Sequence, residues 1–214
     1  MHENFDEKAR TWDSDPKKVL RAQSVAQAII KAIPLNTKMT ALEYGCGTGL
    51  LSFELLPYLK HITLMDSSSG MIEVLTEKIL SRKIENMKPV QTDLISENIT
   101  NEQYDIIFTL MALHHILNTR IIVQKFHSIL NKNGYLAIVD LDKEDGSFHN
   151  YRTDVLHGFD RDLLKRTLKN IGLHILYDDI CYQTCKITKD NEEKSYSLFL
   201  LVCQKPGNIK NKVL

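Results

Sequence analysis

The stretch ALEYGCGTGLL, residues 41–51, decides the fold expected of this chain. Three glycines, Gly45, Gly47 and Gly49, occupy every second position after a short apolar run that carries one acid, Glu43. Glycine costs a folded chain backbone entropy, so three within five residues predict positive φ angles, the close approach of a bulky group, or both. The flanking apolar residues predict a strand over 40–44 and a helix that begins after Gly49.

Strand and helix patterns alternate on both sides of this glycine turn. An N-cap and proline at Asp15-Pro16 predict a helix that ends before Pro34. Strands are predicted at 61–66, 87–93, 104–110 and 135–141, and helices at 69–80, at 119–134 with Gly134 as the stop, and from the Asp160 cap to Gly172. Such alternation indicates a mostly parallel sheet with helices on both faces, and the runs 174–187 and 194–205 predict an antiparallel hairpin at its edge.

Composition and charge narrow the class of protein. The 214 residues are long enough for one sizeable core, and 27 basic and 27 acidic residues cancel, which disfavours a nucleic acid or membrane partner. No apolar run reaches the roughly 18 residues of a membrane span and the N-terminus lacks a secretory pattern, so a cytoplasmic location is expected. The four cysteines lack the paired spacing of a zinc site, and no metal site is predicted.

The spacing of the glycines separates two kinds of nucleotide-binding turn. A dinucleotide-binding turn requires G-x-G-x-x-G, because its third glycine lets the helix and the strand pack closely. Here the spacing is G-x-G-x-G, and Leu50 occupies the place of that third glycine. The turn permits close approach of a ligand without specifying pyrophosphate geometry, which disfavours a nicotinamide-dependent oxidoreductase.

The segment from Glu43 to Gly49, with Asp66 ending the next strand, resembles class I S-adenosylmethionine-dependent methyltransferases. The similarity continues in family order through DSSSGM (66–71), QTDL (91–94), YDIIFTLMALHHI (104–116) and LNKNGYLAIVD (130–140). It implies an α/β, Rossmann-like, doubly wound sheet of seven mostly parallel strands, with an antiparallel C-terminal strand and helices on both faces. It also implies S-adenosyl-L-methionine as cofactor and S-adenosyl-L-homocysteine as product.

The resemblance further implies which residues contact the cofactor. Glu43 would place negative charge near the ligand's amino group and sulfonium, while Gly45, Gly47 and Gly49 would leave room for its methionine portion and ribose. Asp66 would accept hydrogen bonds from both ribose hydroxyls. The other expected cofactor-binding residues are Met71, Asp93, Leu94, Thr109 and Leu110.

Two adjacent histidines are the candidate catalytic residues. Methyl transfer from a sulfonium requires alignment and exclusion of water, and a general base only when the acceptor is a hydroxyl or a weakly acidic carbon. His114 and His115 lie just beyond the strand predicted over 104–110, at the ligand edge of the sheet. The alternative is that the pair packs against, or caps, the following turn. As a base, either histidine would make turnover rise with pH through its own titration.

The acceptor pocket is predicted from two further segments. Phe5 and Trp12 resemble the aromatic N-terminal segment that closes over the cofactor in small-molecule methyltransferases, although packing on the core is the alternative. His149, Tyr151, Arg152 and His157 follow the strand predicted over 135–141, where either an acceptor pocket or an ordinary connection is expected. The chain lacks the proline-containing motif of adenine methyltransferases after the fourth strand, so a small-molecule acceptor is expected and nucleic acid is not.

These observations predict a helical lid segment over 1–36, a methyltransferase domain over 37–206 and a frayed tail over 207–214. The predicted function is methyl transfer from S-adenosylmethionine to a small molecule. The alternatives are a catalytically silent S-adenosylmethionine-binding module that acts through a partner, and a nicotinamide-dependent oxidoreductase. The sequence indicates neither the acceptor atom nor the oligomeric state.

Overall fold

The computed structural model describes residues 4–93 and 102–207. Its strands are β1 (Thr40–Tyr44), β2 (His61–Asp66), β3 (Met87–Gln91), β4 (Tyr104–Leu110), β5 (Leu130–Leu141), β6 (His174–Ile187) and β7 (Glu193–Gln204). The α-helices are α1 (Phe5–Lys8), α2 (Pro16–Ala32), α3 (Leu50–Leu55), α4 (Ser69–Ser81), α5 (Thr119–Ile129) and α6 (Arg161–Asn170). Short 3-10 helices are η1 (Ala9–Ser14), η2 (Leu56–Tyr58), η3 (Leu113–His115) and η4 (Ser147–His149).

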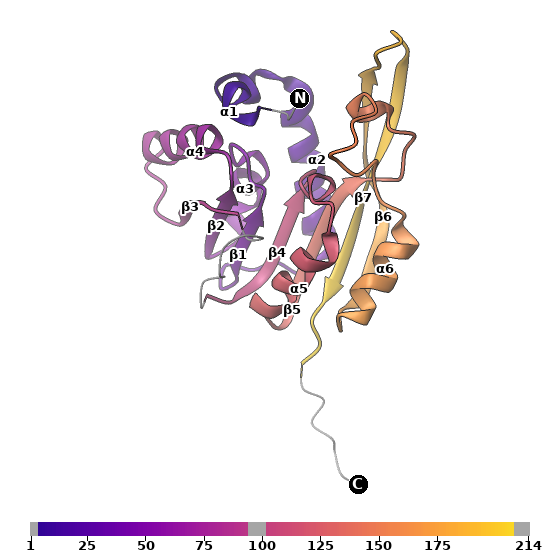
Figure 1. Ribbon diagram of the computed structural model, residues 1–214. Helices are drawn as coiled ribbons and strands as arrows, with labels where there is room; N and C mark the ends of the chain where they lie inside the picture. Colours follow the sequence, from indigo (N-terminus) through magenta and orange to yellow (C-terminus); the bar gives the residue numbers. More distant parts are fainter. Residues whose placement is uncertain (1–3, 94–101, 208–214) are drawn as a thin grey trace.

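The seven strands form one sheet in the order β3-β2-β1-β4-β5-β7-β6 (Figure 1). Strands β1 to β5 pair in parallel, whereas β7 is antiparallel to both β5 and β6. The strand order reverses between β1 and β4, so the carboxyl ends of these two strands flank the position where open α/β sheets bind ligands. The predicted fold class, including the antiparallel C-terminal strand, is confirmed.

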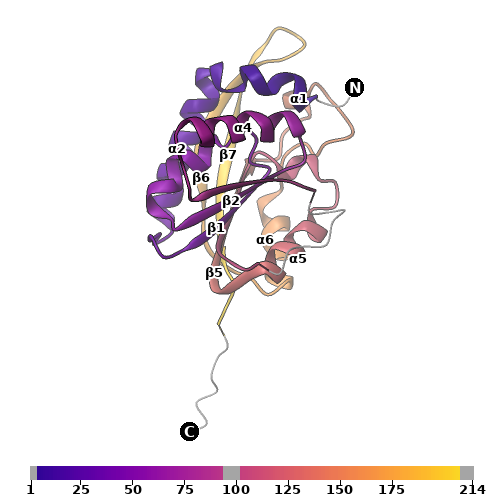
Figure 2. The same cartoon turned by 90° about the vertical axis from the view of Figure 1, so that its left-hand side faces the viewer.

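Helices cover both faces of the sheet, as Figure 2 shows for α2 and α4 on one side and α5 and α6 on the other. Neighbouring strand residues point to opposite faces, so Ala41 joins the core under α2, α3 and α4, and Leu42 joins the core under α5 and α6. In β4, Ile106 and Phe108 enter the first core and Ile107 enters the second. Because both faces are covered, the central strands are mostly apolar, with buried polar residues such as Glu43 near their carboxyl ends.

The C-terminal end of α5 differs from the sequence prediction. The helix ends at Ile129 rather than at Gly134, and Leu130 already pairs with Tyr104 of β4. Asn133 has a positive φ of 62°, and the β4–β5 register shifts between Tyr104 and Ile106. Gly134, predicted as the helix stop, therefore lies in the irregular start of β5. Strand pairing overrides the local helical pattern here.

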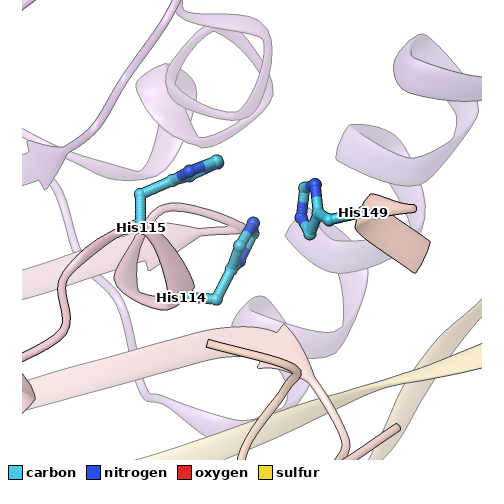
Figure 3. Close-up of side chains that lie close together, drawn as sticks. All are labelled: His114, His115 and His149. Atoms are coloured by element: carbon cyan, nitrogen blue, oxygen red, sulfur yellow. The ribbon is translucent and has the colours of Figure 1, made fainter. Parts of the chain in front are cut away.

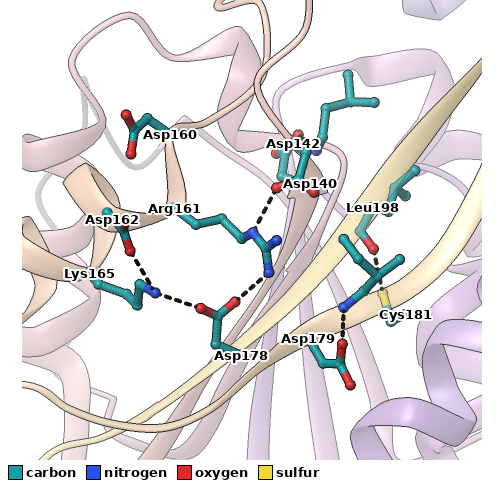
Figure 4. A network of polar contacts seen from close by, with 12 residues as sticks. Asp140, Asp142, Asp160, Arg161, Asp162, Lys165, Asp178, Asp179, Cys181 and Leu198 are labelled. Carbon is teal, nitrogen blue, oxygen red and sulfur yellow. Dashed lines mark hydrogen bonds and ion pairs between the residues drawn. The ribbon is translucent and has the colours of Figure 1, made fainter.

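A polar network joins α6 to the sheet (Figure 4). The N-cap Asp160 accepts a hydrogen bond from the Leu163 amide, as predicted. Asp178 of β6 forms ion pairs with Arg161 at 2.9 Å and with Lys165 at 2.7 Å. Arg161 also forms an ion pair with Asp142 at 2.8 Å. These ion pairs orient α6 over β6, and the apolar contacts of Leu164 and Leu168 bury its inner face.

The last two strands and the first residues extend beyond the sheet's central part. The β6–β7 hairpin projects past the carboxyl ends of the parallel strands, toward the end of the molecule where α1 and η1 lie (Figure 1). Among the described residues, no helix combines the length and apolar character that crossing a membrane requires.

Candidate functional site

The glycine turn between β1 and α3 adopts the backbone that the sequence pattern predicts. Gly45, Gly47 and Gly49 have φ angles of 68°, 53° and 80°. A Cβ atom on Gly45 would lie 2.3 Å from the Cβ of Ala112, whereas a Cβ on Gly47 would meet no heavy atom nearer than Met71 Sδ at 3.8 Å. A Cβ on Gly47 would thus make only ordinary van der Waals contacts at the cavity, and Gly45 allows the turn to approach the segment after β4.

Glu43 is a buried carboxyl at the end of β1, with 2% of its surface exposed. Burial raises its pKa to about 8, although a hydrogen bond from Ser52 Oγ, 2.5 Å from Oε2, opposes this shift. Desolvation disfavours the charged carboxylate in the free protein. A cationic ligand group beside Glu43 would favour the carboxylate again, since opposite charges stabilise each other in a poorly solvated site.

Asp66 lies at the tip of β2 and holds the neighbouring turns together. Its Oδ2 accepts a hydrogen bond from the Gly47 amide at 2.7 Å, and its Oδ1 accepts one from the Ser68 amide at 2.9 Å. Burial raises the pKa of Asp66, while these backbone amides act in the opposite direction. The carboxylate is thus fixed in orientation at the carboxyl edge of the sheet.

These groups border a cavity of about 800 Å³ at the switch point of the sheet. This volume lies within the range of roughly 300 to 1,000 Å³ typical of small-molecule sites. The predicted cofactor residues that line it are Glu43, Gly45, Gly47, Asp66, Met71, Asp93 and Leu110. Leu94, also predicted to contact the cofactor, lies outside the described residues.

The N-terminal segment covers one side of this cavity. Phe5 and Trp12 both line it, with ring centroids 6.0 Å apart. Asp6 accepts hydrogen bonds from Ser68 Oγ at 2.6 Å and from the Gly70 amide at 2.8 Å, at the start of α4. These contacts hold α1 against the helix that follows Asp66.

Three histidines meet at the cavity wall (Figure 3), and the ring of His115 contacts that of Phe5, with centroids 5.4 Å apart. His114 and His115 come from η3 after β4, and His149 comes from η4 after β5. The Nδ1 atom of His114 lies 2.6 Å from Oδ1 of Asp140, a fully buried residue near the end of β5. The structure therefore brings both candidate bases to the cavity and adds His149 to them.

Five predicted site residues do not line the cavity. Gly49 faces α4 instead, where an added Cβ would lie 2.8 Å from Leu75 Cδ1, and Thr109 is wholly buried in β4. The other three follow His149 in the chain: Tyr151, Arg152 and His157.

The backbone explains why only the first member of the predicted acceptor cluster reaches the cavity. Asn150 and Tyr151 both have left-handed φ angles, 53° and 59°, which turn the chain away directly after His149. Tyr151 is half exposed, Arg152 forms a two-bond ion pair with Asp154, and His157 Nε2 lies 2.6 Å from the Arg152 carbonyl oxygen. In this structure these three residues therefore do not line the cavity, and their assignment to an acceptor pocket stays a prediction.

The structure adds cavity residues that the sequence analysis did not identify. Arg21 of α2 lines the cavity, and so do residues 184–187 near the tip of β6. A cation directly before Ala22, on the apolar side of an amphipathic helix, is the signal that could have identified Arg21. For β6 the corresponding signal was the unusual length of the last two strand patterns. A strand of 14 residues extends well beyond the parallel strands β1 to β4, which have 5 to 7 residues.

Comparison with known proteins agrees with this geometry. A family profile described as a methyltransferase domain matches residues 19–177. An uncharacterized methyltransferase of Schizosaccharomyces pombe is 29% identical over 196 residues, covering 76% of this chain and 69% of that protein. A probable S-adenosylmethionine-dependent methyltransferase of Saccharomyces cerevisiae is 31% identical over 106 residues, covering 48% of this chain and 35% of that protein.

A solved structure shows the same fold. YcgJ of Bacillus subtilis superposes with a TM-score of 0.70 at 16% identity, covering 86% of this chain and 98% of that one. Against the curated relatives, this chain spans from about one third to about two thirds of their length.

Proposed function

The chain belongs to the methyltransferase-domain family, as a class I S-adenosylmethionine-dependent methyltransferase; on that premise we propose that it methylates a small molecule in the cavity at the switch point. One observation carries this proposal. The glycine turn, the Asp66 carboxylate and the histidines all border one cavity, and the side-chain-free Gly47 leaves space there.

The residues present fit the cofactor. Gly47 offers a surface against which a ribose and an amino acid portion can lie, and Asp66 offers a fixed carboxylate for ribose hydroxyls. Glu43 offers negative charge to the ligand's cationic groups. When bound, S-adenosylmethionine supplies an electrophilic methyl group on a sulfonium. Asp93, Met71 and Leu110 complete the proposed cofactor side of the cavity.

The chain's own contribution is alignment and the exclusion of water. Phe5 and Trp12 cover the cofactor side, and Phe148 and the tip of β6 border the acceptor side. Such enclosure holds the acceptor atom in line with the methyl group and removes competing solvent. In this proposal His115 or His114 takes a proton from the acceptor where the acceptor requires it, because both lie at the cavity wall.

A small acceptor is favoured over a macromolecule by the shape and charge of the site. The cavity is enclosed by segments from both ends of the chain, and the net charge of zero offers no general attraction for a polyanion. Arg21 adds a cation to a cavity wall that also contains lysines, and its Nε atom is buried without a hydrogen-bond partner among the described residues. The lysines are Lys8, Lys17, Lys18 and Lys186. We therefore propose that the acceptor carries a carboxylate or another small anionic group.

Two measurements test the proposal in sequence. Calorimetry with S-adenosylhomocysteine should show one site per chain, while NAD(H) should give no heat of binding. A screen of small acceptors with a methyl-labelled donor should then yield labelled product, with acidic compounds enriched among the acceptors. Binding of NAD(H) alone would refute the cofactor assignment, and cofactor binding without transfer to any acceptor would favour a silent binding module.

A further inference from the structure

We propose that His114, His115 and His149 form a binding site for one divalent transition-metal ion, with Zn²⁺ as the reference ion. One nitrogen from each residue can be chosen so that all three atoms lie within 4.8 Å of one another. Figure 3 shows the three rings arranged around a common space, from two segments that are far apart in sequence. Imidazole nitrogen is a preferred ligand of Zn²⁺ and its neighbours in the first transition row.

The spacing is compatible with coordination after small side-chain rotations. Donor nitrogens of a tetrahedral zinc site, each about 2.0 to 2.1 Å from the ion, lie roughly 3.3 Å apart. The ring centroid of His114 lies 4.2 Å from that of His115 and 4.8 Å from that of His149. The donor atoms lie within 4.8 Å of one another, so coordination requires them to approach by at most about 1.5 Å.

Asp140 prepares His114 as the central ligand. Its carboxylate lies 2.6 Å from Nδ1 of His114 and also accepts the backbone amide of His114 at 3.3 Å. A carboxylate on one ring nitrogen sets the proton there and leaves the other nitrogen as a donor to a metal ion. That other nitrogen, Nε2, is buried and has no hydrogen-bond partner among the described residues.

Packing of three aromatic rings is the competing explanation for the cluster. Packing accounts for the short centroid distances, but it leaves the buried Nε2 of His114 without a partner, which costs free energy. The Asp140 carboxylate is satisfied in either case, since it bonds the ring and the backbone amide of His114. A metal ion would in addition satisfy the Nε2 atom, with that carboxylate as its outer support.

The metal site adds detail to the proposed function. Metal binding itself does not depend on that function, whereas the role of the ion in methyl transfer does. Three protein ligands leave a fourth position on the ion, as in zinc sites that bind water or substrate. All three histidines line the cavity, so that position faces the acceptor. With an ion bound, the histidines serve as ligands rather than as the general base, and the ion takes over that role: an acceptor hydroxyl or thiol bound to it loses its proton more readily. This points to oxygen or sulfur as the methylated atom.

Metal binding by the full chain tests the inference without any acceptor. Chelator-treated protein should take up one Zn²⁺ per chain by calorimetry, and Co²⁺ should produce the visible absorption of a four-coordinate site. His115→Gln combined with His149→Gln should abolish both signals. Asp140→Asn should weaken Zn²⁺ binding by about 10- to 100-fold, the usual effect of losing an outer carboxylate. His127→Gln, on α5 outside the cavity, is the matched control and should bind normally.

The outcomes separate this inference from the proposed function. Wild-type protein that binds S-adenosylhomocysteine but neither Zn²⁺ nor Co²⁺ would overturn the metal site alone. Zn²⁺ binding that survives in the double histidine variant would show that the ion binds elsewhere and would also overturn it. Circular dichroism of each variant checks that the variant is folded, so that a lost metal signal can be assigned to the lost ligands. The Co²⁺ spectrum of the wild type tests the site without any variant.

Discussion

Glu43 is a residue whose protonation state depends on the fold. In water a glutamate carboxyl titrates near 4.5, whereas burial raises the pKa of Glu43 to about 8. Between these values the unfolded chain has released the proton that the folded chain retains. The folded state therefore loses stability as pH rises through this window, by up to about 1.4 kcal/mol per pH unit.

Glu43→Gln tests this linkage. Glutamine keeps the shape of the protonated acid and has no charge to desolvate, so the free energy of unfolding should become flatter between pH 5 and 8. In the absence of ligand, the variant should be more stable than the wild type at pH 8, as measured by urea denaturation across pH. The matched control is Glu85→Gln, an exposed glutamate, which should leave the wild-type slope unchanged. Parallel pH profiles for Glu43→Gln and the wild type would contradict the assignment.

Asp66 is the proposed anchor of the ribose. Asp66→Ala should weaken S-adenosylhomocysteine binding by about 1.5 to 3 kcal/mol, or roughly 10- to 150-fold, because hydrogen bonds to a charged group are lost. Calorimetry on the folded variant measures this directly. Asp142→Ala removes a carboxylate beyond β5 that does not line the cavity, and it should bind normally. Equal affinities for the two variants would refute the ribose assignment.

Gly47 combines a positive φ with a place on the cavity wall, where it borders the cavity space. Gly47→Val should abolish cofactor binding, because its branched side chain would enter that space, and should also cost about 1 to 3 kcal/mol of stability through backbone strain. Gly172→Val separates the two effects, since Gly172 has a φ of 98° and lies outside the cavity. It should lose stability while keeping its affinity. A valine at position 47 that binds normally would mean that the glycine serves the turn alone.

At the scale of elements, α1 and α4 meet at Gly70. An added Cβ there would lie 2.8 Å from the Cα and 2.9 Å from the carbonyl oxygen of Asp6, so the contact is between backbones. Gly70→Ala should displace the N-terminal segment while favouring α4 itself, because alanine is the better helix former by about 1 kcal/mol. Faster hydrogen exchange at residues 5–14, with weaker S-adenosylhomocysteine binding, is the expected result. Unchanged exchange would show that α1 is not held by this contact.

At the scale of the whole molecule, the predicted lid over 1–36 consists of two unlike parts. Residues before α2 contact α4, the cavity wall and, through Asp13, the hydroxyl of Thr48. In contrast, Val25 and Ile29 of α2 and the following Ile33 are buried in the main core. Each such side chain contributes about 1.5 to 3 kcal/mol on burial, against a total stability of roughly 5 to 15 kcal/mol.

Deletions should therefore separate the two parts. Removing residues 1–14 should leave a cooperative thermal transition and weaken cofactor binding, because the Asp15 cap and α2 remain. Removing residues 1–36 should abolish the transition. A folded protein that lacks residues 1–36 would support the boundary at residue 36 that the sequence predicts, and calorimetry of both deletions completes the comparison.

Local features of the sequence determined most of the elements. The strands at 40–44 and 61–66, the glycine turn and the Asp160 cap follow from side-chain periodicity and from backbone preferences of single residues, which act over a few positions. The position of Asp66 at a strand tip follows from the same local pattern. The family resemblance rested on these segments, and so could be recognised without tertiary contacts.

Tertiary structure decided what depends on distant parts of the chain. The end of α5 at Ile129 follows from pairing of Leu130 with β4, and left-handed residues after His149 turn Tyr151, Arg152 and His157 away from the cavity. The meeting of His149 with His114 and His115, and the burial of Asp140 behind them, require strands β4 and β5 to lie side by side. Sequence periodicity predicts that such strands exist, but only their packing brings side chains from separate loops into one site.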